Sequence, residues 1–181
     1  MATVIKYVTK MLLLVASLLF FSCTSSTSLQ EYLVEGAQRS DFISVDLPAS
    51  ILKIDQESLT KEQKEAYKSV KKLNVLILPL KDDNQAVYNE ERMRVNEILK
   101  SGKYQDLMRI NDKHMKGVIK YLGTDEEIDE LILFGSSDDK GFALVRVLGK
   151  DMKPENMSTL IEALQRSNID EASLGGLKQF F

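Results

Sequence analysis

The spacing of hydrophobic side chains between residues 29 and 165 switches between a helical and an extended pattern. Apolar residues three and four positions apart, the mark of one buried helix face, predict helices that begin at Leu29, after Thr60, after Asn84 and at Pro154. Strict alternation of apolar and polar residues in "FISVDLP", from Phe42, predicts a half-buried strand instead. Pro154 suits the first turn of a helix, where its missing N–H has no partner to lose.

Helix starts carry recognisable capping residues. Ser28 with Glu31, and Thr60 with Gln63, have the spacing of a capping box, in which each side chain satisfies a backbone N–H of the first turn. These two boxes predict the starts of the first and second helices.

The third helix is predicted from Asn84, as N-cap, to Gly102, which favours a helix end. Within it, Glu90 and Arg94 are four residues apart, so we expect them to form an exposed ion pair.

Two kinds of strand follow from the remaining pattern. The continuous apolar run from Val75 to Leu78 in "NVLILPL" predicts a strand buried on both faces, ended by Pro79. After Tyr104, four apolar stretches alternate with short turn sequences. Such short links predict an antiparallel meander built from "DLMRIN", "HMKGVIKYL", "IDELILF" and "FALVRVL".

The order of elements predicts the fold class. Helix, strand, helix, strand, helix, four antiparallel strands and a last helix indicate one α+β domain over residues 29–165. We expect a two-layer sandwich, a mainly antiparallel sheet with helices packed on one face and water on the other. The tail, residues 166–181, lacks a clear period, so we expect it to be loosely ordered, at most docking Leu177, Phe180 or Phe181 in a neighbouring groove.

The first 22 residues have the pattern of a secretory signal peptide. Lys6 and Lys10 precede an uncharged apolar run from Met11 to Phe21, and the small residue Ser22 follows. A run of about eleven residues is too short to cross a hydrocarbon core, which needs roughly 20. Cleavage is therefore predicted between Ser22 and Cys23.

Cys23, the single cysteine, lies directly after that stretch, and the sequence around it resembles the lipobox of bacterial lipoproteins. The resemblance implies that the cysteine sulfur is acylated, with palmitate or a similar chain, and becomes the first mature residue, with residues 23–28 as a Thr/Ser tether. The alternatives are an ordinary signal peptide with a chance cysteine, or an uncut membrane anchor. Thr24 is not the aspartate that favours retention in the inner membrane of such lipoproteins, so the periplasmic face of the outer membrane is expected.

Composition narrows the partners. The chain has 24 Lys+Arg against 27 Asp+Glu, a formal net charge of -3, and no basic stripe, which argues against nucleic acid as a partner. The expected partners are the membrane, through the lipid anchor, and an envelope protein.

Candidate chemistry is sparse. His114 is the single histidine and Asp112 lies two residues before it, so a hydrolytic or metal site would depend on this pair or on a distant carboxylate. The acidic pairs and triplet do not have the ligand spacing of a calcium loop, and we interpret them as solvated turns: Asp82-Asp83, Asp125-Glu126-Glu127 and Asp138-Asp139. No catalytic, cofactor or metal site is assigned, and no cofactor is expected.

The segments "LQEYLVEGAQRSDFISVDLPASIL", "YQDLMRIND" and "IDELILFGSSDDKGFALVRVLGKDM", with the closing "MSTLIEAL", resemble the bacterial lipoprotein family catalogued as domain of unknown function 4252. The resemblance covers about Leu29 to Leu164. It implies a small Gram-negative envelope lipoprotein and supplies no site residues. The expected role is a non-enzymatic binding or interaction module tethered to the membrane; the alternative is an envelope hydrolase or metal-dependent enzyme that uses His114.

Overall fold

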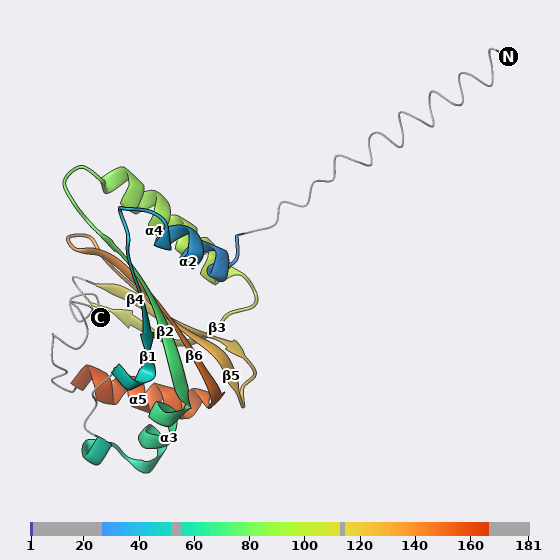
Figure 1. The fold of residues 1–181 in the computed structure, drawn as a ribbon, viewed down its shortest axis with the longest axis vertical. Coiled ribbons are helices and arrows are strands. Elements are labelled where there is room, and N and C mark those ends of the chain that lie inside the picture. Colours follow the sequence, from blue (N-terminus) through green and yellow to red (C-terminus); the bar gives the residue numbers. More distant parts are fainter. Residues whose placement is uncertain (2–26, 52–55, 113–114, 167–181) are drawn as a thin grey trace.

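The structure is a computed structural model that describes Met1 and residues 27–51, 56–112 and 115–166 of the 181. Helices and strands alternate in the first half, and four successive strands and a helix make up the second (Figure 1). The elements are α2 (Leu29–Ala37), β1 (Ile43–Pro48), η1 (Ala49–Ile51), η2 (Gln56–Ser58), α3 (Lys61–Ser69), β2 (Val70–Pro79), α4 (Gln85–Lys100), β3 (Gln105–Asn111), β4 (Lys116–Gly123), β5 (Ile128–Ser137), β6 (Gly141–Met152) and α5 (Pro154–Arg166).

The strands form one open six-stranded sheet in the order β1-β2-β6-β5-β4-β3. Every neighbouring pair is antiparallel. The α+β class and the antiparallel meander of β3 to β6 are therefore confirmed.

The tight β5–β6 turn ends at Gly141, whose φ of +110° suits glycine, and a Cβ there would lie 2.1 Å from the Leu78 carbonyl oxygen.

The prediction that helices cover one face of the sheet is wrong, because α2 and α4 pack on one face and α3 and α5 on the other (Figure 1). Successive residues of a strand point to opposite faces. In β2, Val75 and Ile77 lie in the core with α3 and α5, whereas Leu76 and Leu78 lie in the core with α2 and α4. The sheet is thus the middle of three layers, and the prediction that β2 is buried on both faces is confirmed.

The core under α2 and α4 is rich in aromatic rings. Phe142 of β6 is fully buried and lies edge-on to Phe42 and Phe134, with ring centroids 6.2 and 5.5 Å away. Tyr88 of α4 is also fully buried, and its hydroxyl donates a hydrogen bond to the Ser137 carbonyl, 2.8 Å away. Edge-to-face contacts of this kind stabilise a core by about 0.5–1.5 kcal/mol each beyond the burial of area.

The core under α3 and α5 is mainly aliphatic. Ala66 of α3 and Leu160 of α5 pack over Val75, Val145 and neighbouring side chains.

Both predicted capping boxes are present: Ser28 and Glu31 start α2, and Thr60 and Gln63 start α3.

Asn84 does occupy the N-cap position of α4, as predicted, but its side chain does not cap the helix. Its Oδ1 accepts from the Lys81 N–H at 2.8 Å, and its Nδ2 donates to the Pro79 carbonyl at 2.9 Å. The side chain therefore closes the turn between β2 and α4.

The described helices include none that is long and apolar enough to cross a membrane.

Candidate functional site

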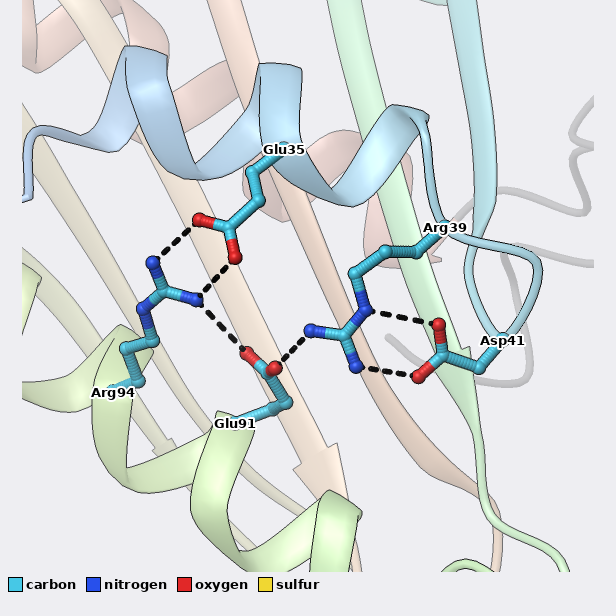
Figure 2. A network of polar contacts seen from close by, with 5 residues as sticks. All are labelled: Glu35, Arg39, Asp41, Glu91 and Arg94. Carbon is cyan, nitrogen blue, oxygen red and sulfur yellow. Dashed lines mark hydrogen bonds and ion pairs between the residues drawn. The ribbon is translucent and has the colours of Figure 1, made fainter.

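A network of two arginines and three carboxylates joins α2 and the loop after it to α4 (Figure 2). Arg94 holds Glu35 with both terminal nitrogens, the longer of the two hydrogen bonds being 2.9 Å. Arg39 holds Asp41 through Nε and Nη2, at 3.0 and 2.6 Å. Glu91 lies between the two arginines, bonded to Arg39 Nη1 and 3.9 Å from Arg94 Nη1. The five charges sum to -1.

Glu91 is the buried member of the network. Its side chain is 7% exposed, against 31% for each arginine. Within the described part of the chain, Glu91 Oε2 and the hydroxyl of the buried Tyr32 lack a hydrogen-bond partner. Burial of a carboxylate is strongly unfavourable without a cation beside it, so the arginines are what allow Glu91 to stay buried.

Charge and burial perturb the groups around Glu91. The hydrogen bonds from Arg94 hold the pKa of Glu35 below its usual value, and those from Arg39 do the same for Asp41. Burial, followed by the charge of Glu91, raises the pKa of the Tyr32 hydroxyl well above its usual range. Tyr32 therefore stays a neutral phenol at any physiological pH.

The arginines also stack on the aromatic core. The Arg39 guanidinium lies 4.7 Å from the centre of the Phe42 ring, and that of Arg94 lies 5.1 Å from the centre of the Tyr32 ring. Cation–π contacts of this kind contribute roughly 0.5–1 kcal/mol each at exposed sites. The network thus fastens α2 to α4 by charge and stacking.

The prediction that Arg94 pairs with Glu90 along α4 is wrong. Arg94 instead forms ion pairs with Glu35, on α2, and with Glu91. A contact between neighbouring helices replaces the contact within one helix because α2 packs directly along this side of α4.

Sequence reasoning did not predict the role of Glu91, although one signal was present. Tyr88, Glu91, Val95 and Ile98 follow one another at three- and four-residue spacing, so a carboxylate stands in the apolar stripe of α4. Such a position indicates a buried, paired acid. Nothing in the periodicity points to Arg39, which is 52 residues away in the chain.

A cleft of about 200 Å³ lies where α2 begins, beside the last turns of α4 and the start of β3. Ser28, Glu97, Lys103 and Tyr104 line it, together with Arg94 of the network. The lining combines two cations, Arg94 and Lys103, with one carboxylate, Glu97.

The residues predicted to carry chemistry lie mostly beyond the described ranges. Ser22 and Cys23, the predicted cleavage and lipidation sites, and His114 are outside them, and His114 catalysis stays a prediction. Asp112 follows β3, where its backbone N–H donates to the Met115 carbonyl at 2.9 Å. The acidic pairs and triplet lie at the turns before α4, before β5 and before β6. Across ranges 27–51, 56–112 and 115–166, no group of three or more His, Cys, Asp or Glu side chains is placed to hold a metal ion.

Fold and site together define a small three-layer α+β domain with an ion-pair network between α2 and α4. The chain belongs to the family described as "Domain of unknown function (DUF4252)", whose model matches residues 35–160. That range takes in Glu35, Arg39, Asp41, Glu91 and Arg94, so the whole network lies inside the family domain. No curated protein and no solved structure matches the chain.

Proposed function

We propose that this protein is a lipoprotein of the bacterial cell envelope, held at the membrane by acyl chains on Cys23, and that its domain is a binding or interaction module. The observation that carries the proposal is the stretch from Lys6 to Cys23: two lysines, an uncharged run of eleven residues that is apolar except at Ser17, a small residue and the single cysteine. Acylation would also account for a single cysteine in an oxidising compartment, where unpaired cysteines are uncommon.

The tether is short, and this determines what the domain can reach. Helix α2 starts at Leu29 with Ser28 as its N-cap, five residues beyond Cys23. Five residues span at most about 17 Å when fully extended. The start of α2 and the cleft lined by Ser28 and Lys103 would therefore stay within that distance of the lipid attachment point.

Acyl chains hold such a domain firmly. Each buried methylene contributes about 0.8 kcal/mol, so one chain anchors only marginally, whereas two or three anchor for practical purposes permanently. Surfaces open to a partner include the cleft and the edge of the sheet at β1, where Ile43 and Val45 are exposed.

Fractionation of cells that express the full chain with Cys23→Ser tests the anchor. The unsubstituted protein should remain with the membranes after a high-salt wash, and the Cys23→Ser variant should not. Ser25→Ala is the matched control, because it changes the tether and leaves the sulfur in place. A Cys23→Ser variant that stays in the washed membranes would refute the anchor.

The side of the envelope has its own test. Since Thr24 replaces the aspartate of retained lipoproteins, the protein should sediment with the outer membrane on a density gradient. Thr24→Asp should shift it to the inner membrane, and a protein that is already there without the substitution would contradict this part of the proposal.

A further inference from the structure

The two edges of the sheet differ in how they are protected. Unpaired edge strands invite pairing with other chains, and proteins commonly block them with bulges and charges. Edge strand β3 has both: its register with β4 shifts between Asp106 and Met108, and Asp106 forms ion pairs with Arg109 and Lys120.

Edge strand β1 has no bulge, and its one charge is bound within the protein. It pairs with β2 in unbroken register from Ile43 to Pro48. Its one charged side chain, Asp46, is already bound by Lys72, at 2.7 Å, and by the Asn74 amide. The four residues from Ile43 to Asp46 are all exposed, and Ile43 and Val45 are 51% and 39% exposed. No strand in the described ranges pairs with its outer side.

We propose that β1 pairs antiparallel with β1 of a second copy of this chain, centred on Val45, and joins the two sheets into one. The strand is complementary to itself in this register. Val45 faces the partner's Val45, Ile43 faces the partner's Leu47, and Ser44 faces the partner's Asp46. No two like charges lie opposite each other, and apolar pairs of this kind stabilise adjacent strands.

The pairing also extends a core that already exists. Ile43, Val45 and Leu47 lie opposite Ile77, Val75 and Leu73 of β2, on the face covered by α3 and α5. In the paired state their side chains would form a continuous apolar strip across the join. The hydroxyl of Ser44 and the carboxylate of Asp46 point to the other face.

The symmetry of the pair agrees with two anchors in one membrane. Adjacent antiparallel strands of one sheet are related by a twofold axis perpendicular to the sheet. That rotation leaves both α2/α4 layers on the same side. Since each tether joins at the start of α2, both acyl groups would reach the same lipid surface.

The size of the contact predicts when it forms. Six residues a side is far below the roughly 20–30 residues a side of a stable soluble interface. The pair should therefore be weak in solution and form when anchoring concentrates the protein on a surface. In this respect the inference rests on the proposed lipid anchor.

Disulfide trapping in membranes tests the pair, with the full chain carrying Val45→Cys. Directly opposite residues of antiparallel strands have Cα atoms about 4.5–5.5 Å apart, within the range of a disulfide. A mild thiol oxidant should convert most of the Val45→Cys chains into a species of twice the mass. Arg109→Cys, exposed on the β3 edge, is the matched control and should stay monomeric. Equal dimer yields from the two variants, or none from Val45→Cys, would overturn the proposal.

Further variants test whether the tail or a different protein, and not a second copy, covers the β1 edge. Deleting residues 167–181 should leave the yield unchanged, and a dimer that appears only after the deletion would show that the tail covers β1. A cross-linked species of any mass other than twice the chain would also refute self-pairing. Val45→Lys, which needs no oxidant, should abolish chemical cross-linking between copies in membranes.

The same samples also test whether Cys23 is acylated. The unsubstituted chain should give no disulfide dimer, because an acylated Cys23 has no free thiol. A dimer linked through Cys23 would refute the anchor, whereas acylated Val45→Cys chains that stay monomeric would refute the pair alone.

Discussion

The α2/α4 layer packs aromatic rings against the sheet and has ion pairs that join α2 and its loop to α4, whereas the α3/α5 layer is held to the sheet mainly by aliphatic side chains. On the first side Arg39 and Arg94 bind three carboxylates and stack on Phe42 and Tyr32. On the second, the residues that pack over the sheet include Ala66, Met157, Leu160 and Ile161. The layer next to the proposed anchor is thus the one whose stability depends on charge, and acid should loosen it before the other.

Loss of core volume should have the largest effect on either side of the sheet. Phe142→Ala removes a ring that contacts Phe42, Tyr88 and Phe134, and we expect it to lower the free energy of unfolding by about 4 kcal/mol. Leu160→Ala on the opposite face should lower it by about 3 kcal/mol. Urea unfolding of the mature chain carrying Cys23→Ser measures both. A loss under 1 kcal/mol in either variant would show that its layer is not packed as described.

Removal of the cation beside Glu91 should cause the next largest loss in the free energy of unfolding. Arg39→Met leaves a buried carboxylate with Arg94 Nη1, 3.9 Å away, as its nearest cation in the network, and should destabilise the same soluble chain by about 3 kcal/mol. Lys72→Met, which breaks the exposed pair with Asp46, is the control and should lose at most about 0.5 kcal/mol. Adding Glu91→Leu to Arg39→Met should recover stability, because the buried charge is then gone. A double variant less stable than Arg39→Met alone would contradict the role given to Glu91.

The pH dependence should be smaller, and the ion pairs of the α2/α4 layer should contribute to it. Hydrogen bonds from arginine lower the pKa of Glu35 and Asp41 in the folded state. Their contribution is therefore complete above the unfolded-state values, 4.5 and 3.8, and is lost as the pH falls through the lower folded-state values. Urea midpoints between pH 7 and pH 3 should fall less steeply for Asp41→Asn than for the unsubstituted chain. Leu160→Ala, which removes no ionisable group, should keep the unsubstituted slope, and an Asp41→Asn slope equal to it would contradict the role given to the Arg39–Asp41 pair.

Local signals in the sequence predicted much of the fold. The continuous apolar run from Val75 to Leu78 identified a strand buried on both faces, and the capping boxes at Ser28 and Thr60 identified two helix starts. The second helical layer was missed, although the same kind of run recurs in "LILF" of β5 and "FALV" of β6. Apolar residues at consecutive strand positions require cover on both faces, which a one-sided sandwich does not provide.

The network could not be predicted in the same way. Its carboxylate at Glu91 interrupts an apolar stripe, which is visible in the sequence, but its partner Arg39 comes from a loop 52 residues earlier. Periodicity describes one element at a time, whereas ion pairs between elements depend on how the helices are packed. The predicted lipidation at Cys23 depends on processing enzymes and membrane chemistry, so folding physics alone does not test it.

The intact mass of the protein extracted from native membranes tests the central claim most directly. Lipidation predicts a chain that begins at Cys23, lacks residues 1–22, and carries the added mass of two or three acyl chains on its first residue. A mass equal to the full 181-residue translation, or to a processed chain with an unmodified cysteine, would contradict it.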